Sequence, residues 1–185
     1  MKTISLLIFT VFLAVSLGCK LGAMFGSGEL SIPDKHFAVK FPGGSGDVET
    51  QPGKAKNKYV VTPGTVYTKD FDNHSDNFRS YEVTVFDLKA DPPTDISSES
   101  TVLALGLNGW YGEPETTTKE VTVNGMHALD SVRTIALGPT KMTFREVVFW
   151  SNKEKLLYVL RIAATKKENT ATPEGEGFIN SFRMI

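Results

Sequence analysis

The second half of the chain has the hydrophobic pattern of consecutive β-strands. Three turn signals, Asn124-Gly125, Leu137–Thr140 and Ser151–Glu154, divide the segment Lys119–Ala163. Asn-Gly readily adopts the positive φ angles of a two-residue hairpin. The stretches between the turns are rich in β-branched and aromatic residues, which favour strands. The pattern therefore predicts a four-stranded antiparallel meander.

The alternation inside this meander indicates how its sheet is covered. Met142–Trp150 is apolar on one side in its first half and on both sides in its second half. Leu156–Leu160 is apolar at every position, and Arg161 is the first interruption. A strand that is apolar on both faces needs cover on both faces. We therefore expect helices or a folded-over layer on each side.

Shorter strand patterns precede the meander. They end at proline, glycine or polar clusters, which mark turns. The predicted strands are His36–Phe41, a short one around Val48–Thr50, Tyr59–Val61, Thr65–Phe71 and Phe78–Leu88.

Two segments have helical signals. Ser98 is a plausible N-cap, and the apolar residues after it recur at helical spacing, which predicts an amphipathic helix over Ser98–Trp110. Thr172-Pro173-Glu174 has the cap, proline and acid of a helix start and predicts a short last helix. Trp110 and Tyr111, at the exit of the first helix, are weak candidates for a ligand or partner contact, with core or rim packing as the competing interpretation.

The N-terminus has the organisation of a secretory signal. A basic start is followed by the apolar run Ile4–Leu17, which is shorter than the ~20 residues of a membrane span but suits a signal peptide. The run closes on Gly18-Cys19 and resembles a bacterial lipobox, in which the signal is cut before the cysteine and the cysteine is lipidated. The resemblance implies residues 1–18 as signal peptide and Cys19 as a lipid anchor in the membrane.

Two other interpretations of this segment stay open. An ordinary signal peptidase would cut near Ser16 or Gly18, or an uncleaved anchor would continue to Phe25, although Lys20 counts against the anchor. Lys20 also differs from the aspartate that retains some lipoproteins in the inner membrane, which favours the outer membrane facing the periplasm. We expect residues 19–34 to form the anchor and a flexible, glycine-containing tether, and residues 35–185 to form one domain.

Composition excludes several classes of site. The 185 residues have a formal net charge of −1, which argues against a nucleic-acid partner. Cys19 is the single cysteine, and the three histidines have no metal-ligand spacing, so we expect no disulfide, metal or cofactor. Ser97, Ser98 and Ser100 lie close together in sequence, but no Gly-x-Ser-x-Gly elbow accompanies them, so a hydrolase is not indicated.

Four phrases carry a resemblance to a known family. Phe37–Pro42, Val123–Gly125, Leu157–Leu160 and Phe178–Phe182 occur in this order. They resemble PsbP-like (Mog/PsbP-type) small domains of planctomycetes and related bacteria, which are often lipoproteins. The resemblance covers about Lys35 to the C-terminus. It implies an α+β fold, with a central antiparallel sheet of about six to seven strands and helices on both faces, and a domain that is mostly non-catalytic.

Two functions follow as expectations. The first is a lipid-anchored, non-enzymatic module that binds a protein partner or assists assembly at the cell envelope. The second is a secreted or envelope domain that binds an apolar small molecule or lipid between sheet and helix. A deep apolar pocket lined by Trp110, Phe149 and Tyr158 would favour the second, and a filled core there would exclude it.

Overall fold

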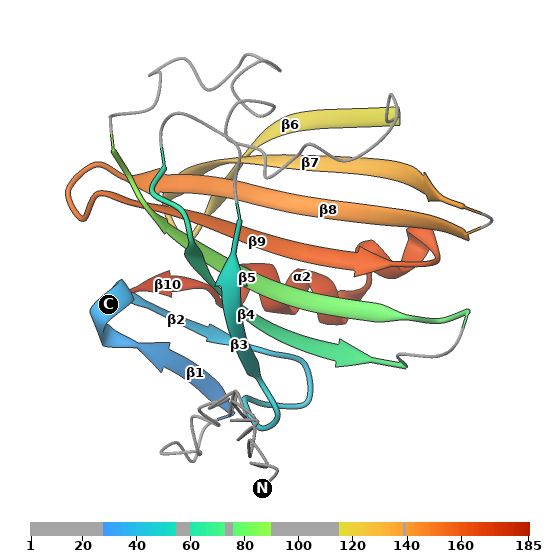
Figure 1. Cartoon of the computed structure of the whole chain (residues 1–185), viewed down its shortest axis with the longest axis horizontal. Coiled ribbons are helices and arrows are strands. Elements are labelled where there is room, and N and C mark those ends of the chain that lie inside the picture. The colour runs from blue at the N-terminus through green and yellow to red at the C-terminus, as the bar shows by residue number, and fades with distance from the viewer. Residues whose placement is uncertain (1–27, 55–59, 73–75, 90–114, 139) are drawn as a thin grey trace, which may run out of the picture.

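The computed structural model describes residues 28–54, 60–72, 76–89, 115–138 and 140–185. Within these ranges the strands form two antiparallel sheets (Figure 1). The large sheet has seven strands in the order β3-β4-β5-β9-β8-β7-β6, and the small sheet has three in the order β1-β2-β10. The strand bounds are β1 Glu29–Ile32, β2 Phe37–Lys40, β3 Glu49–Gly53, β4 Gly64–Phe71, β5 Arg79–Asp87, β6 Glu115–Val123, β7 Met126–Leu137, β8 Thr140–Ser151, β9 Leu156–Ala164 and β10 Arg183–Met184.

The predicted meander is confirmed. Strands β6 to β9 pair successively with their neighbours in antiparallel register. Asn124 and Gly125 have φ angles of 47° and 80°, which are the two positive values that a type I′ hairpin requires. The turn chemistry of this dipeptide therefore forms the β6–β7 hairpin that the sequence predicts.

Strand β9 lies in the middle of the large sheet. It pairs with β8 on one side and with β5 on the other, so the early hairpin β4–β5 joins the late meander through β9. All side chains of Leu156–Leu160 are buried, as the uninterrupted apolar run predicts for a central strand covered on both faces.

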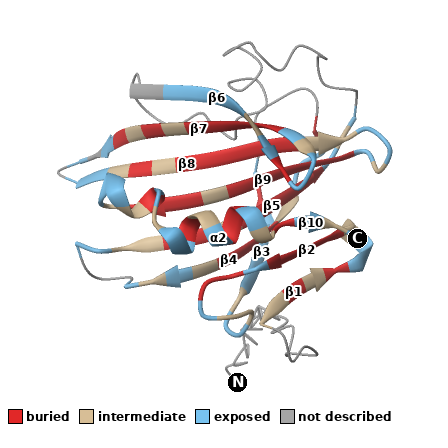
Figure 2. Ribbon diagram, turned by 180° about the vertical axis from the view of Figure 1, so that it is seen from behind, coloured by how far each residue is buried: buried red, intermediate tan, exposed pale blue. Residues whose placement is uncertain are grey.

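One face of the large sheet is covered by a helix and by the small sheet, and we call it the helix face (Figure 2). Helix α2 spans Pro173–Ser181, and the Thr172 hydroxyl accepts a hydrogen bond from the Gly175 N–H at 3.1 Å. At the other end of α2, the Asn124 side chain donates to the Asn180 carbonyl at 2.9 Å. The predicted last helix is therefore confirmed, and its C-terminal end is tied to the β6–β7 turn.

An aromatic cluster fills the space between the helix face and its cover. Phe149 and Tyr158 stack with ring centroids 5.4 Å apart, and Phe182 meets both edge-on at 4.8 and 5.4 Å. Phe37 of the small sheet stacks on Phe182 at 5.5 Å. All four rings are at most 2 % exposed. The Tyr158 hydroxyl donates to the Lys35 carbonyl at 2.9 Å, which satisfies its polar group.

The described residues correct the expected α+β arrangement with helices on both faces. Within them the structure is mainly β, and α2 lies on one face, where the small sheet supplies the rest of the cover. The first strands fold back as a second layer because their alternating apolar residues pack on the aromatic cluster. The predicted helix Ser98–Trp110 lies outside the described residues. In the described part of the chain, no helix has the length and hydrophobicity to span a bilayer.

One described strand lies N-terminal to the expected domain start at Lys35. Glu29–Ile32, within the segment 19–34 assigned to the tether, forms β1 and pairs with β2 in the register Leu30↔Val39. Leu30 and Ile32 are buried. Alternation of apolar and polar residues over only four positions is therefore enough to form a strand when a partner strand is adjacent. Of the predicted strand Tyr59–Val61, Tyr59 lies outside the described residues, and Val60 forms an isolated bridge with Leu88.

Two glycines of α2 give a matched stability test. Glycine in a helix interior is destabilising by roughly 0.5–1 kcal/mol relative to alanine. A Cβ at Gly177 would meet nothing within 4 Å, whereas one at Gly175 would lie 2.9 Å from Ile162 Cδ1. We expect Gly177→Ala to raise the free energy of unfolding by about 0.5–1 kcal/mol. Gly175→Ala should gain less or lose stability, because Ile162 must move. Denaturant unfolding measures both, and an equal or larger gain for Gly175→Ala would contradict the packing described.

Candidate functional site

The face of the large sheet that points away from α2, here the opposite face, carries a continuous polar line. Cα pairing places one polar residue of each strand on this line. The residues, in strand order from β3 to β6, are Glu49, Thr68, Glu82, Arg161, Glu146, Ser131 and Thr118.

Four charged side chains at the centre of this face form a chain of ion pairs, which we call the charged row: Glu82, Arg161, Glu146 and Arg133. Arg161 donates through Nε to Glu146 at 2.8 Å and through Nη1 to Glu82 at 2.9 Å. Arg133 donates through Nη2 to the second oxygen of Glu146. The Glu146 side chain is only 4 % exposed. A buried carboxylate persists in its charged form only with such partners, and Glu146 has two.

The pKa shifts follow the number of partners. Burial alone would raise the pKa of Glu146, but Arg161 and Arg133 together hold it below its usual value. Burial raises the pKa of Glu82, because Arg161 opposes the shift while the neighbouring acids Glu146 and Asp70 add to it. Burial also lowers the pKa of Arg133, with Glu146 opposing the shift and the nearby Arg161 adding to it. The charges of Glu82 and Arg133, at the two ends of the row, are therefore the less compensated ones.

A pocket of about 350 Å³ lies over part of the charged row. Its apolar lining comes from the ends of β7, β8 and β9 and from the residue before β5: Phe78, Ile135, Met142, Phe144 and Ala163. The guanidinium carbons of Arg133 and Arg161 each lie 6.0 Å from the Phe144 ring centroid, within the range of a cation–π contact. The pocket thus combines an apolar wall with a charged floor.

The polar lining of the pocket is not uniform. Arg133 and Arg161 lie toward β7 and β9, whereas Glu49 and Asp70 come from β3 and β4. Two hydroxyls, Thr68 and Ser80, also line the pocket and are within hydrogen-bond distance of each other at 3.3 Å. The size, the apolar wall and the few convergent polar groups are typical of a ligand site.

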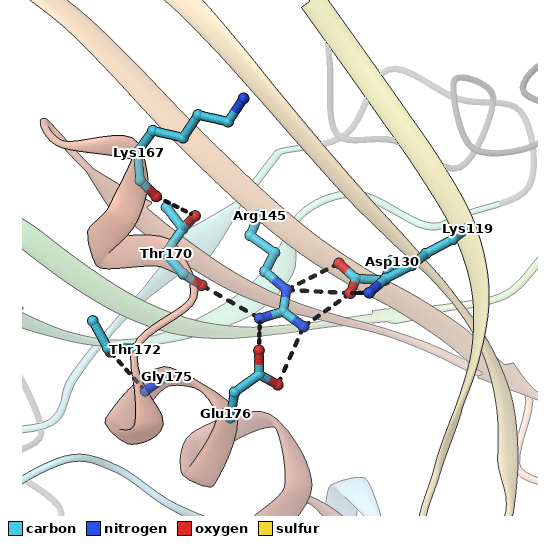
Figure 3. Close-up of polar contacts among 8 residues, drawn as sticks. All are labelled: Lys119, Asp130, Arg145, Lys167, Thr170, Thr172, Gly175 and Glu176. Carbon is cyan, nitrogen blue, oxygen red and sulfur yellow. Dashed lines mark hydrogen bonds and ion pairs between the residues drawn. The ribbon is translucent and has the colours of Figure 1, made fainter.

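The helix face has its own buried arginine with a different role (Figure 3). Arg145 donates through Nε and Nη2 to Asp130, at 3.0 and 2.9 Å for the shortest contacts, and through Nη1 and Nη2 to Glu176. It also donates to the Thr170 carbonyl at 3.4 Å. Thr170 belongs to the 3₁₀ turn η2, Lys167–Thr170, and Glu176 belongs to α2. Arg145 therefore ties this C-terminal segment to the sheet, and all three of its nitrogens are used.

The sequence-predicted site residues are not joined in one place. Cys19, Trp110 and Tyr111 lie outside the described residues. Phe149 and Tyr158, two of the three residues expected to line an apolar pocket between sheet and helix, are instead packed in the aromatic cluster. The core at these two residues is filled, which counts against an apolar ligand site between sheet and helix there.

The described histidines lie near the surface, each beside a glutamate, and do not line the pocket. His36 is 3.4 Å from Glu154, and His127 is 3.2 Å from Glu120. Within the described ranges, no group of three or more acidic, histidine or cysteine side chains is arranged to hold a metal ion.

Sequence reasoning missed the charged row. Its clearest local signal is Arg161, a charged residue in the otherwise apolar strand β9. Glu146 gives a weaker signal, because β8 contains other polar and charged residues. Neither signal says which charges meet, because the pairing of β5 with β9 is set by the tertiary fold.

Comparison with known proteins gives a likeness of structure alone. No family model and no curated protein sequence matches the chain. The chain is structurally similar to the Saccharomyces cerevisiae Ran-binding protein Mog1p, with a TM-score of 0.46 and 13 % sequence identity, over 84 % of this chain and 94 % of that chain. This likeness concerns the arrangement of the backbone, and we take no function from it.

Glu146 and Glu82 form a matched pair for testing the charged row. Glu146→Gln leaves two buried guanidinium groups without their shared carboxylate, so we expect a loss of about 3–5 kcal/mol in the free energy of unfolding at pH 7. Glu82→Gln removes a less compensated charge and should cost about 1 kcal/mol. Denaturant unfolding measures both losses. Equal losses would contradict the inference that Glu146 contributes more to stability than Glu82.

The pH dependence of stability tests the contribution of Glu146 separately. Since the pKa of Glu146 is lower in the folded than in the unfolded chain, the unfolded chain takes up this proton first as the pH falls. The stability due to Glu146 is present above the unfolded pKa of about 4.3 and is lost as the pH falls through the folded value. The fall in stability below that pH should therefore be shallower in Glu146→Gln than in the native chain.

Proposed function

We propose that the chain is a membrane-anchored bacterial lipoprotein whose domain binds a partner at the cell envelope without catalysing a reaction. The observation that carries the binding function is the pocket of about 350 Å³ over the charged row. The anchor is proposed from Cys19 at the end of the apolar N-terminal run. Lys20 favours the outer membrane, with the domain facing the periplasm.

The position of β1 favours a domain close to the membrane. Since β1 begins at Glu29, nine residues separate it from Cys19 (28 − 19 = 9). A fully extended chain from Cys19 to Glu29 reaches at most about 36 Å. Partners of the domain would therefore be at the membrane surface or in the adjoining periplasm.

Binding is favoured over catalysis by how the polar groups of the pocket are used. Glu82 and Arg161 pair with each other, and the hydroxyls of Thr68 and Ser80 lie at hydrogen-bond distance from each other. Among the described residues that line the pocket there is no histidine to activate either hydroxyl as a nucleophile. The alternative of a secreted or envelope domain for a wholly apolar small molecule has less support, because the described pocket contains charges.

The anchor is tested by comparing the native chain with Cys19→Ser in the native host. We expect the native chain to carry acyl mass on Cys19 and to partition into detergent, because two or more acyl chains give stable membrane attachment. The variant should keep its signal segment and lack the acyl mass. Intact-mass measurement and detergent partitioning check both points. A soluble native chain cut at another position would exclude the anchor and favour a secreted domain.

The pocket is tested by photocrosslinking in the anchored, full-length chain. A photoreactive phenylalanine analogue replaces Met142, which lines the pocket, or Asn180, which is exposed on α2 and serves as the control. We expect a discrete crosslinked product from position 142 and none of that mass from position 180. The same products from both positions, or none from position 142, would contradict binding at this pocket.

A further inference from the structure

Arg133 makes fewer hydrogen bonds than its burial would require. The side chains of Arg133 and Arg145 are both 9 % exposed, and they lie on the neighbouring strands β7 and β8, on opposite faces of the sheet. Arg145 donates through all three nitrogens. Among the described residues, Arg133 donates only through Nη2, to Glu146. A guanidinium has five N–H donors. Nε and Nη1 of Arg133 are not fully enclosed polar atoms and the residue lines the pocket, so these donors are available to a bound group.

One line of strand register runs along the pocket from Arg133 to an acid. The Cα pairing is Arg133↔Phe144, Phe144↔Ala163, Ala163↔Ser80 and Ser80↔Asp70, and all five residues line the pocket. Asp70 is exposed and has no ion pair with any described residue. The line therefore has a carboxylate at one end, a guanidinium at the other, and a phenyl ring with two small residues between them.

The spacing of the two charged ends sets the size of the matching ligand. Four strand steps separate the Cα atoms of Asp70 and Arg133 by ~19 Å. The two side chains and their hydrogen bonds take up part of this distance. Roughly 10 Å then remains between the charges of a ligand, which corresponds to about three residues of extended peptide.

We infer that the pocket binds a zwitterionic ligand with an apolar middle, namely a short free peptide whose C-terminal carboxylate meets Arg133 and whose ammonium group meets Asp70. The inference rests on the proposed function, because it assigns a ligand class to the same pocket. A purely anionic ligand would bring no positive charge to the pocket acids Glu49, Asp70 and Glu82. A purely cationic ligand would leave the donors of Arg133 unused.

The test measures binding of four probes by NMR, with the methyl groups of Met142 and Ile135 as reporters. The probes are the free tripeptide alanyl-leucyl-alanine, its N-acetylated form, its C-terminal amide, and free leucine. Hydrogen bonds to charged groups are stronger than those between neutral groups. We therefore expect N-acetylation and C-terminal amidation each to weaken binding about tenfold or more. Leucine should also bind at least about tenfold more weakly, because it cannot reach both ends of the line.

Variants assign each end of the peptide. Arg133→Gln should bind the free tripeptide and its C-terminal amide with equal affinity. Asp70→Asn should bind the free tripeptide and its N-acetylated form with equal affinity. Arg183→Gln and Asp87→Asn are the matched controls, because each removes a surface ion pair outside the pocket, and they should keep the native preferences. If Arg133→Gln does not fold, the comparison of free and capped peptides on the native protein still tests whether both charged ends of the peptide are recognised.

Three outcomes would overturn the inference. They are capped peptides that bind as tightly as the free one, leucine that binds as tightly as the tripeptide, and no saturable shift of the pocket methyl groups. Each of these leaves the proposed function intact if photocrosslinking at position 142 captures a partner. Failure of that crosslinking together with absent peptide binding would remove both proposals.

Discussion

The fold depends on the pairing of charges that lie in the middle of its central strands. Arg145 and Glu146 are adjacent on β8, so their side chains point to opposite faces of the sheet. Arg145 meets Asp130 and Glu176 on the helix face, and Glu146 meets Arg161 and Arg133 on the opposite face. A one-residue slip of β8 would turn both charges to the wrong face. The cost of an unpaired buried charge therefore fixes the register of β7, β8 and β9 together.

The same strand positions a structural contact and a candidate site. Through Arg145, β8 holds the turn η2 and helix α2 against the sheet, which completes the cover of the aromatic cluster. Through Glu146, β8 orients the two guanidinium groups that lie by Phe144 in the pocket. Stability and binding are thus coupled, since Glu146 serves both the register of the sheet and the floor of the pocket.

The two faces differ in what space they leave. On the helix face the rings of Phe37, Phe149, Tyr158 and Phe182 interlock, and burial raises the pKa of Tyr158 because its ionised form would lie among these rings. On the opposite face a smaller apolar cluster packs around Phe86 and Leu157. Three members of the charged row, Glu82, Arg133 and Arg161, line the pocket beside it. Binding is accordingly proposed where the sheet carries charges and not where it carries most of its apolar surface.

The sequence by itself determined the elements whose information is local. The Asn124-Gly125 hairpin, the apolar run of β9 and the Thr172 cap of α2 need only neighbouring residues, because turn geometry, alternation and capping act over a few positions. The tertiary structure decided which elements meet. It placed β1 as a second layer, filled the pocket expected at Phe149 and Tyr158, and joined Glu82 to Arg161 across 79 positions of sequence. Such pairings depend on strand order, and strand order is set by the packing of the whole sheet rather than by any local pattern of residues.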